Sequence, residues 1–348
     1  MLVLMLLVPA TICYGAREAY QRIGRLPMCA ETLMIVDDTA YVVAAMDGFS
    51  IIDISDPESP MEISRYNQVT HDAMIVEDKA YLACISNGLV ILDISDPSNL
   101  VRLGGYMDSE DGLGIYVEGS YAFLADVGDG LEIIDVSDPR HPVEVGSFND
   151  GGEVFNVHVS QGVAYVADSV DGLEIIDVSA PTAPVLLGKY SDCEYATDLY
   201  INGSVAYVAD STGSLLVVDV EDPQNPRFMG ECGVGGTIYR MHVVEDLVLL
   251  SVLDVGIVLV DVSDSSNPSL VGSIDTANPK DATASNGFIY VCDWDEGLLV
   301  YEIAEEGPVD DDENSSVSDA IPGFPLFAAG IGLILAYLYR PGRKSVHS

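Results

Sequence analysis

Basic residues are scarce in this sequence. Only 14 of its 348 residues are Lys or Arg, against 56 Asp or Glu, which gives a formal net charge of −42. Eleven of the 14 basic residues are spread singly over the first 280 positions. Nucleic acids are bound by clusters of Lys and Arg. The composition therefore argues strongly against a nucleic-acid partner.

Metal-binding and helical signatures are missing as well. The six cysteines form no CxxC or CxxxH pair, which argues against a zinc or iron–sulfur site. Outside the two chain ends, no stretch has the 3.6-residue apolar period of a helix. Hydrophobic residues nevertheless make up 49% of the chain, too many for a disordered acidic protein. The sequence thus predicts an acidic globular protein with a large core.

The N-terminal end resembles an export signal. Residues 2–13 are apolar and precede the small residues Gly15 and Ala16, as in a secretory signal, although the positive n-region is missing. We therefore interpret residues 1–16 as a signal peptide. A buried N-terminal strand is the alternative interpretation.

The C-terminal end has the pattern of a membrane anchor. Residues 308–320 form an acidic, Ser-containing linker without apolar periodicity. Residues 321–339 are then uncharged, long enough as a helix to cross a bilayer. Three basic residues follow within 340–344, so the positive-inside rule predicts that the chain before the helix lies outside the membrane.

A short motif at the start of this tail adds a resemblance. Pro322, Gly323 and Phe324, followed by the apolar span and the basic end, resemble the PGF-CTERM sorting signal of archaeal surface proteins. The resemblance implies that an archaeosortase removes the span and attaches the chain to a lipid. A membrane anchor that is never processed is the alternative, and both place the protein on the cell surface. A strongly acidic composition also suits salty surroundings.

The region between the two ends is one repeat, present seven times. Each copy carries a run such as GLEIIDVSDPRHP (130–142), which ends in an acid followed by turn-forming residues. The acids are spaced by 40 to 42 residues, a period typical of propellers and solenoids. They are Asp53, Asp93, Asp135, Asp177, Asp219, Asp261 and Glu302.

Each repeat contains four short β-rich segments separated by turn signals, which predicts one antiparallel propeller blade. The last repeat stops after its third segment, whereas YQRIGRLP (20–27) matches the fourth segments of other repeats. We therefore predict an all-β, seven-bladed propeller over residues 17–307. Its last blade is completed by the N-terminal strand, which removes two open sheet edges.

With these repeats, residues 20–306 resemble the LVIVD-repeat family, whose repeat core has the form L-V-I-V-D-V-S-D-P. The match is close in repeats two to five, whereas the sixth has Asp264-Ser265 in place of Asp-Pro and the seventh lacks the dipeptide. The resemblance implies a surface-exposed β-propeller and supplies no common catalytic residue. Physically, the Asp-Ser-Asp-Pro run is turn chemistry, since Asp binds nearby amides and Pro fixes φ.

One end of the predicted propeller is rich in acids. Four blades end their second strand in Asp: Asp126, Asp168, Asp210 and Asp293. The adjoining hairpin tips add Asp47, Asp129, Asp171, Asp254, Asp295 and Glu296. Such carboxylates could bind Ca²⁺, but the DxDxDG loop with its bidentate Glu is absent and Asp before Gly favours a turn. We therefore expect solvated turns rather than a metal site. We expect no cofactor, with Ca²⁺ at this face as the alternative.

A second group of candidate residues belongs to the innermost strands, near the predicted mouth of the axis. Its members are His158, His242, Asp198, Arg240, Lys280 and Asp281. His beside carboxylates could perform acid–base chemistry. No nucleophile is spaced to pair with them, so we expect packing between blades, with Arg240 and Lys280 neutralising Asp198 and Asp281 or binding an anion.

Together these features predict a non-catalytic, surface-anchored scaffold that binds an envelope or surface-layer protein or glycan. The alternative is an extracellular enzyme or a Ca²⁺-dependent binder that uses the acidic face. The sequence also allows a disulfide between Cys193 and Cys232 without requiring one.

Overall fold

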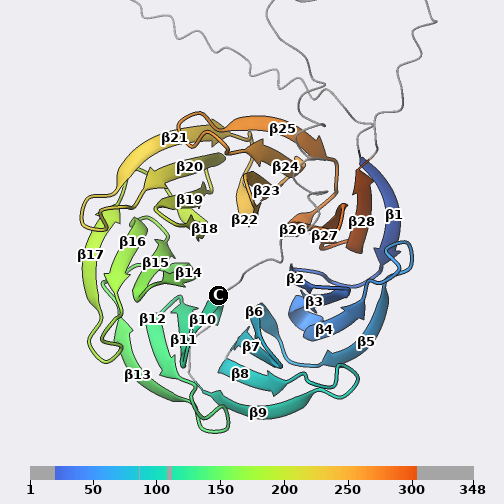
Figure 1. Cartoon of the computed structure of the whole chain (residues 1–348), viewed down its shortest axis with the longest axis horizontal. Coiled ribbons are helices and arrows are strands. Elements are labelled where there is room, and N and C mark those ends of the chain that lie inside the picture. Colours follow the sequence, from blue (N-terminus) through green and yellow to red (C-terminus); the bar gives the residue numbers. More distant parts are fainter. Residues whose placement is uncertain (1–19, 86, 108–111, 304–348) are drawn as a thin grey trace, which may run out of the picture.

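Seven four-stranded antiparallel sheets are arranged as blades around one axis (Figure 1). The computed structural model describes residues 20–85, 87–107 and 112–303. These residues confirm the prediction of an all-β, seven-bladed propeller. Within them no helix is long and apolar enough to cross a membrane. The predicted signal peptide, acidic linker and C-terminal helix lie outside the described residues.

The strands follow the chain from the inside of each blade to the outside. Blade 1 consists of β2 (Thr32–Val36), β3 (Thr39–Val43), β4 (Phe49–Asp53) and β5 (Met61–Tyr66). Blade 2 consists of β6 (Thr70–Val76), β7 (Lys79–Cys84), β8 (Gly88–Asp93) and β9 (Val101–Tyr106). Blade 3 consists of β10 (Gly112–Glu118), β11 (Tyr121–Asp126), β12 (Gly130–Asp135) and β13 (Val143–Phe148). A single 3-10 turn, η1 (Ala45–Asp47), lies between β3 and β4.

Blades 4 to 7 repeat this order. Blade 4 consists of β14 (Val154–Ser160), β15 (Val163–Asp168), β16 (Gly172–Asp177) and β17 (Val185–Tyr190), and blade 5 of β18 (Ala196–Asn202), β19 (Val205–Asp210), β20 (Ser214–Asp219) and β21 (Arg227–Gly233). Blade 6 consists of β22 (Ile238–Val244), β23 (Leu247–Val252), β24 (Gly256–Asp261) and β25 (Ser269–Ile274). Blade 7 consists of β26 (Pro279–Ser285), β27 (Phe288–Asp293), β28 (Gly297–Ile303) and the N-terminal β1 (Tyr20–Leu26).

The hydrophobic core lies between neighbouring blades. The second and third strands of each blade are buried on both faces, so they are nearly continuous apolar runs such as VAYVAD and GLEIID. One cluster, for example, packs Phe123 and Ile133 of blade 3 against Val157 and Val166 of blade 4. Each blade therefore depends on its neighbours to bury its surface.

The repeated Asp-Ser-Asp-Pro run forms the turn between the third and fourth strands, as its chemistry predicted. In blade 3, Asp135 Oδ1 accepts the amide of Ser137 at 2.9 Å. The turn also contacts the preceding blade, because a Cβ added to Gly104 would lie 2.4 Å from the carbonyl oxygen of Pro139. Glycine at this position lets the outer strand approach the next blade's turn.

The N-terminal strand closes the ring, as the sequence predicted. β1 pairs antiparallel with β28, with Tyr20 opposite Ile303 and Leu26 opposite Leu298, and forms the outer strand of blade 7 (Figure 1). Tyr20, Ile23 and Leu26 pack against the core clusters on either side of this blade. Blade 7 is thus assembled from the two ends of the repeat region.

Deleting residues 20–27 should destabilise the whole ring. The deletion exposes the edge of β28 and removes three partly buried apolar side chains, about 3 kcal/mol or more of hydrophobic burial. We expect a Tm decrease of at least about 5 °C in thermal unfolding. The control deletes residues 309–316 of the predicted linker and should leave Tm unchanged. Equal Tm values for the two deletions would contradict closure by β1.

Candidate functional site

Three buried carboxylates connect the innermost strands of adjacent blades. We call Asp72, Asp198 and Asp281 the inner-ring carboxylates; they are 9%, 3% and 4% exposed. Each accepts the amide of the following residue and a second amide from the next blade. The second donors are Ile115 at 3.1 Å, Met241 at 2.7 Å and Leu33 at 3.1 Å, respectively.

The inner-ring carboxylates share one cation across the axis. Arg240 of blade 6 places Nη1 3.7 Å from Asp72 Oδ1 of blade 2 and donates from Nη2 to the His71 carbonyl at 3.3 Å. Burial raises the pKa of Asp198 and of Asp281 to about 6, although Arg240 and the amides act in the opposite direction. Burial lowers the pKa of Arg240, but the surrounding carboxylates outweigh it and raise the value overall.

The other candidates on the innermost strands also contact neighbouring blades. His158 lies between Tyr116 and Tyr200, with ring centroids 4.6 and 5.3 Å away. The side-chain amide of Asn156 donates to Asp198. His242 lies on β22 and is half-buried. The structure thus places His158 and Asn156 in contacts between blades around the axis.

The four Asp residues at the ends of the second strands are buried rather than solvated. Their exposed fractions range from 0 to 4%, so the expectation of solvated turns is wrong in this respect. Three of them bind turn amides: Asp126 accepts from Gly128 and Asp129, Asp210 from Thr212, and Asp293 from Asp295 and Glu296. The turn amides donate the hydrogen bonds that water would otherwise supply, so these carboxylates can be buried.

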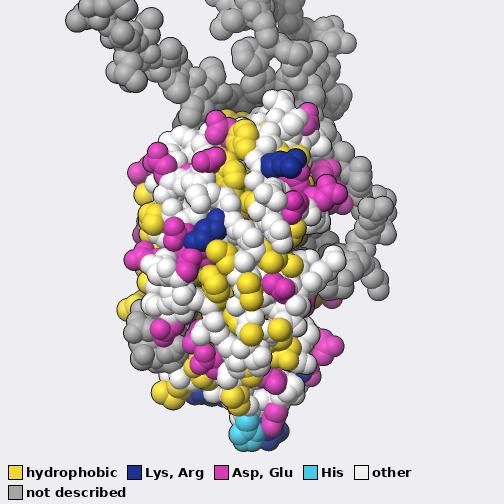
Figure 2. All heavy atoms as spheres, turned by 90° about the vertical axis from the view of Figure 1, so that its left-hand side faces the viewer, with side chains coloured by type: hydrophobic (Ala, Val, Ile, Leu, Met, Phe, Trp, Pro, Cys, Tyr) yellow, Lys and Arg dark blue, Asp and Glu magenta, His cyan; other side chains and the backbone are white. Residues whose placement is uncertain are grey.

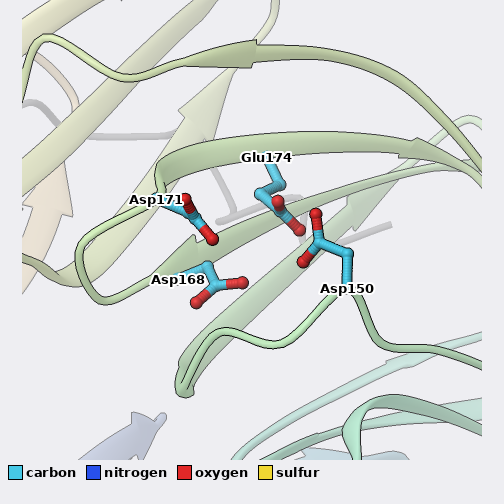
Figure 3. Close-up of side chains that lie close together, drawn as sticks. All are labelled: Asp150, Asp168, Asp171 and Glu174. Atoms are coloured by element: carbon cyan, nitrogen blue, oxygen red, sulfur yellow. The ribbon is translucent and has the colours of Figure 1, made fainter.

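Asp168 differs from the other three and belongs to a group of acids. Its hairpin turns with Ser169 at a φ of 36°. Its carboxylate accepts the amide of Glu153 from the loop before β14, and its Oδ1 has no hydrogen-bond partner. Instead, the carboxylates of Asp150, Asp168, Asp171 and Glu174 point toward one another (Figure 3), with one oxygen of each within 4.8 Å of the others. We call these four residues the blade 4 acidic cluster.

Lys189 on β17 is the counter-ion of this cluster. Its Nζ lies 2.5 Å from Asp150 Oδ2, 2.5 Å from Glu174 Oε1 and 3.9 Å from Asp171 Oδ2. Burial still raises the pKa of Asp168 to about 6 and that of Glu174 to about 7, with Lys189 opposing both. One ammonium therefore only partly compensates four carboxylates.

A different kind of surface surrounds Lys280. We define the hairpin face as the end of the propeller formed by the hairpins between second and third strands and by the loops that enter the innermost strands. There the Lys280 ammonium lies 3.9 Å from the ring centroid of Tyr239, which is 38% exposed, and 5.7 Å from that of Trp294. Phe155 and Tyr195 form a second ring pair, 5.6 Å apart.

Our sequence interpretation missed Glu174, Tyr239 and Trp294. A weak signal for Glu174 was present. Five repeats have Ser50, Val90, Leu216, Val258 or Leu299 at its position, and blade 3 has the one other acid there, Glu132. Acids in an otherwise uncharged, buried column indicate local partners. The disulfide left open is not formed: Cys193 and Cys232 are free, buried thiols in different core clusters.

Among the described residues, the outer wall carries no comparable arrangement. Figure 2 shows hydrophobic side chains interspersed with acidic ones on the wall at the left of Figure 1. Val143, Val185 and Phe228 are each more than half exposed near the starts of the outer strands β13, β17 and β21. Singly exposed apolar residues of this kind are ordinary on soluble proteins.

The fold and its inner-ring contacts define a closed seven-bladed β-propeller. The chain belongs to the LVIVD-repeat family, as the resemblance predicted. The family model matches seven consecutive segments: residues 30–68, 70–108, 111–150, 151–192, 194–234, 240–276 and 279–305. A comparison with curated protein sequences gives no match.

Several solved propellers share the fold at very low sequence identity. The computationally designed Ika8 protein is 8% identical, with a TM-score of 0.62 over 81% of this chain and 100% of that one. The WD40 repeats of RRP9 are 10% identical, with a TM-score of 0.67 over 83% and 98%. The Pan2 WD40 domain of Neurospora crassa is 9% identical, with a TM-score of 0.65 over 84% and 98%. At such identities the similarity shows the fold alone.

Replacing Arg240 with Met should destabilise the ring in a pH-dependent way. The substitution removes the cation shared by the inner-ring carboxylates, and we expect a loss of about 3–5 kcal/mol in the free energy of unfolding at pH 8. Their folded-state pKa values are raised, so their protonated forms favour folding. That contribution is complete below about pH 4 and is lost as the pH rises through about 6 and above.

The loss in the free energy of unfolding caused by Arg240→Met should therefore be much smaller at pH 5 than at pH 8, as measured by urea unfolding. Arg227→Met, on the exposed start of β21, is the matched control and should have little effect at either pH. A deficit of equal size at both pH values would show that Arg240 acts by packing alone.

Proposed function

We propose that this protein is a non-catalytic binding scaffold and that the hairpin face is its contact surface. The observation that carries the proposal is the Lys280–Tyr239–Trp294 group, which presents rings and a cation together at that face. Partly exposed aromatic side chains give large contact areas at low entropic cost and dominate many interfaces. They also stack on the apolar faces of sugars, so both protein and glycan partners of the envelope fit.

The roles of the inner-strand residues support a scaffold over an enzyme. Asp72, Asp198 and Asp281 use their oxygens on amides of two blades, and Arg240 serves as their shared cation. A general acid or base must instead be available to a substrate. Side chains committed to holding blades together favour a rigid ring whose loops make the contacts.

Binding by the full-length chain to isolated envelope fractions and to a glycan array tests this proposal. The double variant Tyr239→Ala/Lys280→Ala should lose most of the binding. The control Arg140→Ala/His141→Ala changes the turn before β13, at the opposite end of the blade, and should bind as wild type. Equal binding by both variants would contradict the assigned face. Turnover of a substrate that disappears with His158→Ala, His242→Ala or Arg240→Ala would contradict the non-catalytic role.

Surface display is the second part of the proposal. It rests on the sequence of residues 321–348 with Pro322, Gly323 and Phe324, which lie outside the described residues. In this proposal an archaeosortase processes the tail and the propeller faces the exterior. Mass spectrometry of the native protein should find a chain that ends before residue 325 and carries lipid. A chain ending at Ser348 would contradict the sorting step, and recovery from the cytosol would contradict the topology.

A further inference from the structure

The blade 4 acidic cluster is assembled from the loop before β14 and the β15–β16 hairpin. Asp150 comes from the loop before β14, Asp168 ends β15, Asp171 lies in the hairpin and Glu174 lies on β16 (Figure 3). The loop carrying Asp150 passes very close to Asp168, since a Cβ added to Gly152 would lie 1.8 Å from Asp168 Oδ1. Glycine at this position lets the loop enclose the cluster.

A buried oxygen in the cluster lacks a hydrogen-bond donor. Asp168 is 1% exposed and its Oδ1 has no hydrogen-bond partner. An ionised oxygen that is buried without a hydrogen-bond donor is strongly destabilising. Lys189 does not satisfy it, because its ammonium contacts Asp150, Glu174 and Asp171. The four carboxylates are therefore suitable ligands for a cation, and the buried Asp168 oxygen has no hydrogen bond to compensate its charge.

We propose that the blade 4 acidic cluster binds a divalent cation, with Ca²⁺ as the best fit. All four side chains offer carboxylate oxygens, the ligands preferred by hard cations. Oxygens on opposite sides of Ca²⁺ lie about 4.8 Å apart, and those on opposite sides of Mg²⁺ about 4.1 Å. The ligand oxygens of the cluster all lie within 4.8 Å of one another, close enough for one ion to contact them all. Ca²⁺ accepts several carboxylates in irregular geometry, whereas Mg²⁺ requires a near-ideal octahedron and keeps several waters, so Ca²⁺ fits four carboxylates better. This proposal is independent of the binding surface around Lys280.

Lys189 then competes with the metal for the same oxygens. Its side chain is 26% exposed and reaches the cluster from the outer strand β17, so its ammonium has a path to solvent. When Ca²⁺ binds, the ammonium moves out and the ion takes over its contacts with Asp150 and Glu174. The cation site and the ion pair are thus two states of the same group of acids.

The neighbouring blade shows why a lone Asp is insufficient. Asp210 of blade 5 matches Asp168, and each accepts an amide from the loop before its blade, but Asp210 also binds the amide of Thr212 in its own hairpin at 2.9 Å. The positions of Asp171 and Glu174 are occupied there by Gly213 and Leu216. Asp210 therefore provides a matched control for a substitution at the same place in the fold.

Calcium titration of the chelator-treated full-length chain, by calorimetry and by thermal unfolding, tests the proposal. We expect saturable Ca²⁺ binding that raises Tm, with Mg²⁺ binding more weakly. Asp150→Asn/Asp171→Asn changes the two more exposed ligands, so it should fold and lose at least about tenfold in Ca²⁺ affinity. Asp168→Asn should lose a similar factor.

Two further variants distinguish a built site from general attraction to an acidic protein. Asp210→Asn should retain wild-type affinity. Lys189→Met should bind Ca²⁺ about tenfold more tightly, because the internal competitor is gone. The proposal is overturned if wild type shows no saturable binding at millimolar Ca²⁺, if Asp150→Asn/Asp171→Asn binds like wild type, or if Asp210→Asn weakens binding equally.

Discussion

The hydrogen bond from a backbone amide to an inner-ring carboxylate of the preceding blade is the contact on which the ring depends. An innermost strand pairs with its own blade on one side only, so alternate amides face the neighbouring blade without a ladder partner. Asp72, Asp198 and Asp281 supply that partner to Ile115, Met241 and Leu33. The last contact spans the junction between blades 7 and 1, where the Thr32 hydroxyl adds a bond of 2.6 Å to Asp281.

This use of carboxylates explains how a chain of such negative charge builds a dense core. The charges nearest the axis are placed against amides and share Arg240, so the acids there hold blades together. Most of the remaining acids lie in turns and on loops, where water or nearby amides satisfy them. In the proposed function, specific recognition is left to groups that depart from the repeat, such as Tyr239, Lys280 and Trp294 on the hairpin face. The blade 4 acidic cluster departs from it in the loop through Gly152, since blade 3 also has a Glu, Glu132, at the position of Glu174.

The sequence predicted the architecture because the propeller is periodic. A spacing of 40 to 42 residues, four β segments per repeat and the match of residues 20–27 to a fourth strand were sufficient for blade number and closure. The environment of individual acids was not predictable in the same way. Asp126, Asp168, Asp210 and Asp293 occupy one position of the repeat, yet among the described residues only Asp168 joins three other acids. Blade 3 also has acids at the positions of Asp171 and Glu174, so the difference depends on the path of the loop through Gly152, which does not follow from the repeat.

Amide hydrogen exchange at residue resolution tests the central claim most directly. If inner-ring carboxylates hold a closed ring, the amides of Leu33, Ile115 and Met241 exchange as slowly as amides paired within the ladders of the same blades. The Leu33 amide then exchanges as slowly as those of Ile115 and Met241, although its hydrogen bond to Asp281 joins opposite ends of the repeat region. Rapid exchange at Leu33, with Ile115 and Met241 still protected, would show a ring open between blades 7 and 1. Rapid exchange at all three would contradict the role of the carboxylates.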